Sequence, residues 1–250
     1  MTIRKKPTAK KSTYSNTTRL NKYIAHAGIC SRREADMHIS LGVVKVNSKV
    51  ITALGYQVKE GDVVHFDGKR ITPEKKAYVL LNKPKGFITT TKDEKGRKTV
   101  MDLIAKSTPL RVVPVGRLDR LTTGLLLFTN DGDLAKKLTH PSSVVKKLYH
   151  VKLSKSLKPH DLAQIRRGLT LDDGPVQVDV VSYVKGASKR EIGLEIHSGR
   201  NRIVRRIFEH MGYEVIVLDR VVFAGLTKKD LPRGTWRHLS RQEIDYLKML

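Results

Sequence analysis

The first part of the chain carries apolar residues at helical spacing, followed by short segments of alternating apolar and polar residues. A first helix is predicted, and Gly28 stands where a glycine in the left-handed conformation would end it. Its apolar positions are Leu20, Tyr23, Ile24 and Ala27. The capping-box sequence Ser31-Arg32-Arg33-Glu34 predicts the start of a second helix that ends at Gly42.

Short strands are predicted after this second helix. They cover residues 43–46, 49–51 and 62–66, with turns at Asn47-Ser48 and Asp67-Gly68. Two helices and a small sheet predict a compact domain at residues 18–70. The polar segment 71–76, which contains Pro73, predicts a linker to a second domain.

The remaining residues, 77–250, alternate strand-like and helix-like segments without a regular order. Residues 191–197 show strand alternation most clearly, because Ile192, Leu194 and Ile196 share one face. The predicted strands are 78–81, 111–115, 125–128, 149–153, 176–183, 192–196 and 215–218. This pattern predicts an α+β fold with a mixed, mainly antiparallel sheet.

The composition adds a strong positive charge to this picture. The chain has 49 Lys and Arg against 24 Asp and Glu, a net charge of +25, and at 39% hydrophobic it can still form a core. Such an excess favours a polyanionic partner, either nucleic acid or an anionic membrane surface; simple solubility is the alternative. No apolar run approaches the roughly 20 residues of a membrane span, so we expect a soluble protein.

The sequence lacks the usual motifs of cofactor chemistry. It contains no H-E-x-x-H, no G-x-x-x-x-G-K-[ST] and no G-x-G-x-x-G, so we expect no metal, no bound nucleotide and no other cofactor. Its single cysteine, Cys30, excludes an intramolecular disulfide and indicates a reducing compartment. We therefore expect a cytoplasmic protein. Residues 1–17, which are basic and acid-free, predict a flexible arm; a transit peptide is the alternative.

Asp119 is the most conspicuous candidate for chemistry. It follows a predicted strand within Gly116-Arg117-Leu118-Asp119 and lies between Arg117 and Arg120. A carboxylate held ionised in such a positive field can act as a nucleophile or base. The alternative is that Asp119 only caps a turn or pairs with an arginine.

A second candidate is an arginine-rich helix near residue 205. Ile203, Val204, Ile207 and Phe208 mark its buried stripe, whereas the spacing places Arg202, Arg205, Arg206 and Glu209 on the opposite face. Their mutual repulsion predicts either a bound polyanion or an acidic residue from elsewhere; a solvated face is the alternative. Tyr149, after Lys146-Lys147-Leu148, is either a base-stacking aromatic or a core residue.

Residues 19–47 resemble the S4 RNA-binding module. The resemblance rests on Arg-Leu-Asn-Lys-Tyr-Ile-Ala, Gly28, the Ser31-Arg32-Arg33-Glu34-Ala35 segment and Gly42-Val43-Val44-Lys45-Val46-Asn47. It implies a domain that docks structured RNA through its helix pair. The basic residues placed to contact RNA are Arg19, Lys22, Arg32, Arg33 and Lys45.

The rest of the chain is similar to the pseudouridine synthases of the RsuA/RluB/RluE/RluF type, which also carry an S4 module in front. The resemblance rests on segments in matching order: Leu81-Asn82-Lys83-Pro84-Lys85-Gly86, Gly116-Arg117-Leu118-Asp119, Thr129-Asn130-Asp131-Gly132, Lys147-x-Tyr149, residues 199–205 and residues 233–239. The pair Arg202-Ile203 departs from the His-Gln often found in this family and is closer to its large-subunit members.

This resemblance implies a set of residue roles. Asp119 would attack the ribose or the uracil ring, Arg205 would pair with Asp119, and Tyr149 would stack on the flipped uracil. Leu226 would pack on the other side of the base, and Arg117 would hold the backbone where the base leaves its stack. Arg200 and Arg202 would contact substrate phosphates.

Three functions remain open on the sequence alone. The first is an rRNA pseudouridine synthase, with large-subunit rRNA favoured over small-subunit rRNA. The second is a non-catalytic ribosome-binding or assembly protein, and the third is a DNA-binding protein. We expect a monomer that binds ribosomal RNA or a pre-ribosomal particle, and neither a membrane nor a metal.

Overall fold

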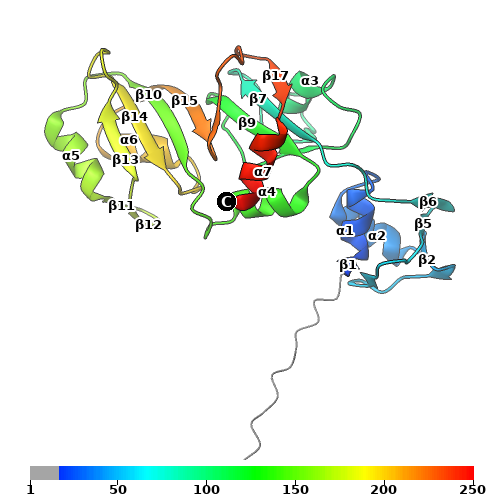
Figure 1. Ribbon diagram of the computed structural model, residues 1–250. Coiled ribbons are helices and arrows are strands. Elements are labelled where there is room, and N and C mark those ends of the chain that lie inside the picture. The colour runs from blue at the N-terminus through cyan, green and yellow to red at the C-terminus, as the bar shows by residue number, and fades with distance from the viewer. Residues whose placement is uncertain (1–16) are drawn as a thin grey trace, which may run out of the picture. The chain divides into compact units, whose positions relative to one another are not determined.

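The computed structural model describes residues 17–250 and divides into two compact units between Lys75 and Lys76 (Figure 1). The predicted basic arm, residues 1–17, lies outside the described residues except for Thr17. The domain and linker boundaries at residues 70 and 76 stay predictions.

The first unit is a helix pair packed on small sheets. Its helices are α1 (Leu20–His26) and α2 (Arg32–Ser40). Its strands are β1 (Thr18–Arg19), β2 (Val44–Val46), β3 (Lys49–Val50), β4 (Gln57–Val58), β5 (Val64–Phe66) and β6 (Lys69–Ile71). Strands β3, β2, β5 and β6 form one sheet in that order, and β1 pairs with β4.

Local signals fix the elements of this unit. The capping box is confirmed, because the Ser31 hydroxyl accepts from the Glu34 amide and Glu34 accepts from the Ser31 amide. The predicted turn at Asn47-Ser48 is also present, with both residues at positive φ, as a two-residue hairpin turn requires. Leu20, Ile24 and Ile39 then close the core beneath the sheet.

The second unit contains a nine-stranded mixed sheet. Its path runs β13–β14–β10–β15–β9–β7–β17, with β16 paired to β15 and β8 paired to β9. The strands are β7 (Tyr78–Lys83), β8 (Val113–Pro114), β9 (Thr123–Thr129), β10 (Lys147–Leu153), β13 (Val180–Tyr183), β14 (Glu191–Ile196), β15 (Val215–Phe223), β16 (Leu226–Thr227) and β17 (Trp236–His238). A separate hairpin joins β11 (Leu169–Leu171) to β12 (Gly174–Val176). The predicted α+β class with a mainly antiparallel sheet is confirmed.

The β7–β9 half of this sheet is buried on both faces, whereas the half formed by β10, β13 and β14 is partly exposed on one face. Strands β7 and β9 are buried along their whole length, because apolar clusters lie on both of their faces. In contrast, β14 alternates between buried and partly exposed residues, so one of its faces is open. The helices are α3 (Val100–Ile104), α4 (Gly132–Thr139), α5 (Pro159–Arg167), α6 (Ile203–His210) and α7 (Arg241–Met249). Apolar residues of α5 and α6 pack against β10, β13, β14 and β15.

The two halves join where β15 runs parallel to β9, whereas the other neighbouring pairs on the sheet path run antiparallel. Asp219 lies opposite Thr123, and Arg220 lies opposite Gly124. A β-carbon on Gly124 would come within 2.3 Å of the Arg220 carbonyl oxygen, and its φ is +105°. This position therefore requires glycine.

Two predicted strands differ from the structure. The segment 176–183 is not one strand, because Val176 ends β12 and the chain leaves that hairpin before Val180 starts β13 in the main sheet. The segment 111–115 forms only Val113–Pro114, in keeping with the missing amide donor of Pro114. Among the described residues, no helix has the length and apolar character that crossing a membrane requires.

Candidate active site

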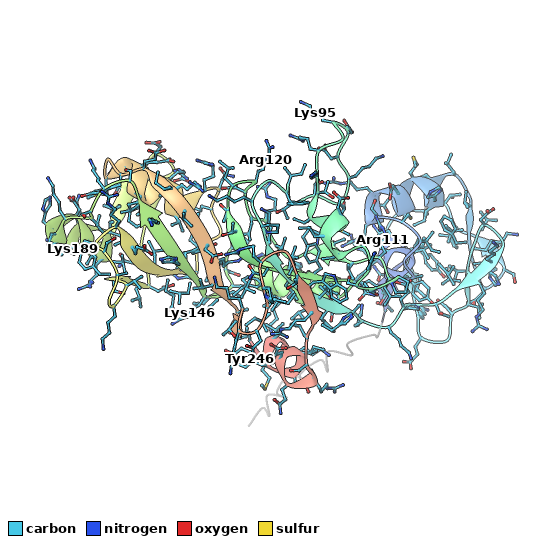
Figure 2. The ribbon with its side chains drawn as sticks, turned by 90° about the horizontal axis from the view of Figure 1, so that it is seen from above. Lys95, Arg111, Arg120, Lys146, Lys189 and Tyr246 are labelled. Carbon is cyan, nitrogen blue, oxygen red and sulfur yellow. The ribbon has the colours of Figure 1, made fainter. Side chains whose placement is uncertain are left out.

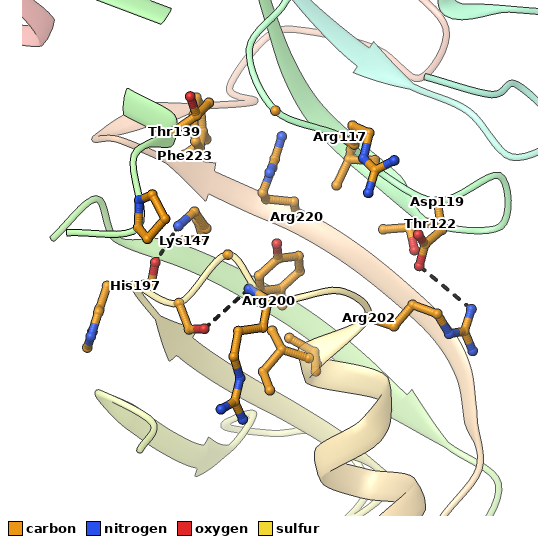
Figure 3. A pocket seen from close by; sticks show the side chains of 18 of the residues that line it. Arg117, Asp119, Thr122, Thr139, Lys147, His197, Arg200, Arg202, Arg220 and Phe223 are labelled. Atoms are coloured by element: carbon orange, nitrogen blue, oxygen red, sulfur yellow. Dashed lines mark hydrogen bonds and ion pairs between the residues drawn. The ribbon is translucent and has the colours of Figure 1, made fainter. Parts of the chain in front are cut away.

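A cavity of about 600 Å³ lies over strands β10 and β15, between residues 115–122 and the start of α6 (Figure 3). Its lining includes five residues from the two strands: Lys147, Tyr149, Leu218, Arg220 and Phe223. Asp119 and Arg202 lie on its other sides. The cavity thus collects residues that are far apart in the sequence.

The loop that carries Asp119 is held by buried contacts on either side of it. Leu118 is 5% exposed and packs into the core below. Its amide and carbonyl both bond to the Thr89 hydroxyl, at 3.2 and 2.7 Å. The Thr122 amide closes a turn on the Asp119 carbonyl at 3.0 Å. The Asp119 side chain is thereby presented to the cavity on a fixed backbone.

Lys83 supports the same loop from within the protein. This fully buried side chain at the end of β7 donates from Nζ to the carbonyl oxygens of Asp119 at 3.1 Å and Thr122 at 2.8 Å. It also donates to Pro84 at 3.1 Å. Burial lowers the pKa of Lys83 to about 8, although the charge of Asp119 acts in the opposite direction. Lys83 is therefore a structural clamp for the Asp119 loop.

The Asp119 carboxylate is 37% exposed and faces Arg202, whose Nη1 lies 3.8 Å from Oδ2. Arg202 precedes α6 and adopts a left-handed conformation with φ +47°. This conformation is uncommon for a residue with a side chain. Its guanidinium also reaches Glu209 at 3.5 Å. Figure 3 shows the Asp119–Arg202 pair at one end of the cavity.

Arg205 does not make the predicted ion pair with Asp119. It is buried rather than on the exposed face of α6, and its Nη1 donates to the Val215 carbonyl at 2.8 Å. Burial and the neighbouring Arg202 lower its pKa, while Asp119 acts on it only as a nearby charge. The prediction from helical spacing that Arg205 lies on the exposed face is wrong. Arg205 is covered because α6 packs against the start of β15, which spacing alone does not show.

The other arginines near α6 are paired with an acid from a distant segment. Arg206 forms two short contacts with Asp173, at 2.6 and 2.8 Å, and Arg200 approaches the same carboxylate at 3.2 Å. The hydrogen bond from Arg206 lowers the pKa of Asp173. The expectation of an acidic residue from elsewhere is confirmed. Arg200 also donates to the Pro175 carbonyl at 3.1 Å, so it braces the β11–β12 hairpin beside the cavity.

Tyr149, Arg117 and Leu226 fall in different surroundings. Tyr149 lines the cavity and packs in part against the core of the β10–β15 half, while exposed Arg117 lies on the Asp119 loop. Leu226 is 2% exposed within the other core and is not among the cavity-lining residues. The expected packing of Leu226 against a base in this cavity is therefore wrong for this conformation, because β16 pairs with the end of β15 and turns Leu226 into the core.

Sequence reasoning missed Arg220 and used Lys147 only as part of a motif. Both line the cavity. The available signal was the pair Asp219-Arg220 inside the apolar segment 215–223, because adjacent charges in a central strand must point to opposite faces. Asp219 does point away, bonding to Arg233 at 2.9 Å and to Thr123 at 2.8 Å.

The cavity is strongly basic. Among its lining residues in the described chain, Asp119 is the single acid. The cations are Arg117, Lys147, Arg200, Arg202 and Arg220. One carboxylate among several cations can attack an electrophilic carbon or move a proton while a polyanion is bound. Within residues 17–250 no group of three or more metal-ligating side chains gathers.

The first unit carries the basic residues predicted to grip RNA. Arg19, Arg32, Arg33 and Lys45 are exposed, and Lys22 is partly exposed. Exposed basic side chains also cover the second unit, including Lys95, Arg120, Lys146 and Lys189 (Figure 2). Both units therefore offer positive charge to a polyanion.

The chain matches two known protein families. The family described as RNA pseudouridylate synthase matches residues 77–210, and the S4 domain matches residues 18–64. The ribosomal large subunit pseudouridine synthase B of Bacillus subtilis is 44% identical over 236 residues, which cover 93% of this chain and 96% of that protein. The protein of the same name from Vibrio cholerae is 38% identical over 93% of this chain and 74% of its own length.

A solved structure agrees with these sequence matches. A crystal structure of a pseudouridylate synthase superposes with a TM-score of 0.63 at 27% identity. The match covers 92% of this chain and 99% of that one.

Proposed function

We propose a substrate and a nucleophile for this chain, which belongs to the RNA pseudouridylate synthase family. The enzyme isomerises a uridine of large-subunit ribosomal RNA to pseudouridine, and Asp119 is its nucleophile. The large-subunit substrate is supported by the similarity to relatives named for that subunit. The observation that carries the role of Asp119 is its carboxylate, the single acid lining a basic cavity in the described chain.

The reaction requires the bond between ribose C1′ and uracil N1 to break and a bond from C1′ to C5 to form. The base must first leave its stack, which costs a few kcal/mol in a duplex and less in a loop. Within the cavity Tyr149 offers an aromatic face on which an extruded uracil stacks. Asp119 then forms a covalent bond to the substrate, either at the ribose or at the uracil ring, and is released when the new bond forms.

The arrangement around Asp119 suits a nucleophile better than a structural carboxylate. Its single ion-pair partner within residues 17–250, Arg202, lies 3.8 Å away, beyond hydrogen-bonding distance. Asp219, which has a structural role, is instead 5% exposed and bonded by several donors. A partly exposed carboxylate with a loose partner can reach a substrate atom without breaking a buried network.

RNA binding is assigned to both units. The exposed cations Arg19, Arg32, Arg33 and Lys45 of the first unit neutralise phosphates and position the RNA. Around the cavity, exposed Arg117 and Arg202 meet the phosphates next to the extruded nucleotide. This division leaves the interior of the cavity for the base.

The test measures release of the uracil C5 hydrogen. Purified full-length chain is incubated separately with large-subunit and small-subunit rRNA that carry tritium at C5 of uridine. We expect release from the large-subunit rRNA and a fall of at least about 1000-fold for Asp119→Asn. Asp245→Asn, which alters an exposed carboxylate of α7, is the control. Undiminished release with Asp119→Asn would contradict the nucleophile, and release only from small-subunit rRNA would contradict the substrate.

A further inference from the structure

Arg220 is a buried cation of the cavity with unused hydrogen-bond donors. The residue is 3% exposed, and its Nε donates to the Leu125 carbonyl at 2.8 Å. Its guanidinium carbon lies 4.5 Å from the centre of the Phe223 ring. Its Nη2 is buried without any hydrogen-bond partner among the described residues. A guanidinium has five donors, and an unmatched buried donor is costly.

The position of Arg220 relates it directly to Tyr149. The two residues are register partners across β15 and β10, and both line the cavity. Lys147 precedes Tyr149 by two residues, lines the same cavity and donates from Nζ to the His197 carbonyl. Because directly opposed residues on neighbouring strands share a face of the sheet, a ring stacked on Tyr149 has Arg220 as its neighbour in the cavity.

The charges around Arg220 are not balanced from within the described chain. Arg220 makes no ion pair there, and the adjacent Asp219 is bound to Arg233, Lys228 and Thr123 away from the cavity. Burial and the charge of Arg220 lower the pKa of Lys147 to about 8, with Asp179 acting in the opposite direction. Two neighbouring cations that line one cavity call for a ligand that brings hydrogen-bond acceptors or negative charge.

Because Arg220 is buried, an RNA phosphate is a poor candidate for this ligand. The phosphates run along the outside of an RNA strand and meet exposed cations such as Arg202, whose side chain is 45% exposed. The part of RNA that can enter the cavity is an extruded base. Among the groups of a uracil, the two carbonyl oxygens are the acceptors that match a guanidinium.

We propose that Arg220 donates a hydrogen bond to a carbonyl oxygen of the extruded uracil and stabilises the negative charge that this oxygen gains during the reaction. This role rests on the proposed function. When the C1′–N1 bond breaks, its electron pair stays with the uracil and spreads over N1 and the carbonyl oxygens. C5 then forms its bond to C1′ and gives up its proton, and N1 takes one up. Arg220 remains protonated throughout.

The test removes one partner of this hydrogen bond at a time. The substrate is an rRNA fragment that contains the uridine modified by the wild type, prepared with uridine, 2-thiouridine or 4-thiouridine at that position. Sulfur is a weaker acceptor than oxygen. Single-turnover rates are measured for the wild type and Arg220→Met. Arg166→Met is the matched control, because Arg166 also donates to a backbone carbonyl, that of Val181, but does not line the cavity.

We expect Arg220→Met to lower the rate on the uridine fragment by about 100- to 1000-fold, as for loss of one oxyanion donor. RNA affinity in filter binding should be unchanged, and Arg166→Met should keep the wild-type rate. One of the two thiouridine fragments should lower the wild-type rate by a similar factor. On that fragment Arg220→Met should cause little further loss, because the same hydrogen bond is already gone.

Two results would overturn the role of Arg220. The first is that Arg220→Met lowers the single-turnover rate by the same factor on both thiouridine fragments as on the uridine fragment. Neither carbonyl oxygen would then be coupled to the guanidinium. The second is a full wild-type rate on both thiouridine fragments, a result that holds even if Arg220→Met fails to fold. If the wild type releases no C5 hydrogen from either intact ribosomal RNA, the proposed function itself fails, which separates the two failures.

Discussion

Asp219 and Arg220 are adjacent in β15, carry opposite charges and lie on opposite faces of the sheet. Their side chains differ in how many hydrogen-bond partners they have. Asp219 is surrounded by donors from Arg233, Lys228 and Thr123. Among the described residues, Arg220 has one backbone hydrogen-bond partner, and its buried Nη2 has none. The first environment is complete without a ligand, whereas the second is incomplete. Within β15 the difference distinguishes Asp219, which stabilises the fold, from Arg220, which lines the cavity and for which we propose a contact with the substrate.

We expect the largest loss of stability from substitution of Asp219. Asp219→Asn removes the charge that binds Arg233 and Lys228, and breaking such a network costs about 3 kcal/mol of unfolding free energy. Chemical denaturation followed by circular dichroism measures it. The control Asp245→Asn, which breaks an exposed pair with Arg241, should cost less than about 0.5 kcal/mol. Equal losses in the two variants would contradict the structural role of Asp219.

A second prediction concerns Lys83, a buried cation whose hydrogen bonds hold the Asp119 loop at the cavity. Lys83→Met should lower the single-turnover rate by about 100-fold, because the loop carbonyls lose their common donor and Asp119 shifts. RNA affinity should stay unchanged. Lys137→Met, which removes an exposed lysine that donates to the Lys248 carbonyl, is the control. A Lys83→Met enzyme with the wild-type rate would show that the clamp is dispensable.

Acid should remove the contribution of Asp219 to the free energy of unfolding. Burial alone would raise the pKa of Asp219, but hydrogen bonds from Arg233, Lys228 and Thr123 outweigh it and lower the pKa to about 2. The unfolded pKa is near 3.8, so Asp219 contributes about 2 kcal/mol above pH 4 and loses this contribution between pH 4 and pH 2. Denaturation midpoints across this range should fall less steeply for Asp219→Asn. Identical acid profiles would contradict this account.

The smallest effects are expected for the exposed cations of the first unit, each of which we propose contacts one phosphate. Each substitution among Arg19, Arg32, Arg33 and Lys45 should reduce the slope of log affinity against log salt by about 0.7 to 0.9. The reaction rate at saturating RNA should stay the same, unlike that of Arg220→Met. Filter binding at several salt concentrations measures the slope. An unchanged slope after removal of all four would show that this face does not hold the RNA.

Local patterns predicted much of the fold. The capping box at Ser31 and the turn at Asn47-Ser48 depend on neighbouring residues alone, so the sequence is sufficient for both. The period of two in residues 191–197 likewise predicted β14. The strand 176–183 was wrong because its two ends pair with different partners, which local alternation does not reveal.

The candidate site was predictable only in part. Asp119 and Tyr149 were found from the sequence, and the structure brings both to one cavity. The predicted pairing of Arg205 with Asp119 and the predicted position of Leu226 in the cavity are absent from the structure, because both depend on how α6 and β16 pack against β15. The Asp219-Arg220 pair signals a charge in a buried strand, but it does not show that Arg220 lacks a hydrogen-bond partner. Such a property exists only in the folded chain.

The central claim, that Asp119 in this cavity isomerises a large-subunit rRNA uridine, is tested most directly in cells. Pseudouridine is mapped across both ribosomal RNAs of a strain that lacks this protein and carries either the wild-type chain or Asp119→Asn. We expect one large-subunit position to become pseudouridine again with the wild-type chain and to remain uridine with Asp119→Asn, although both proteins accumulate equally. Restoration of that position by Asp119→Asn would contradict it.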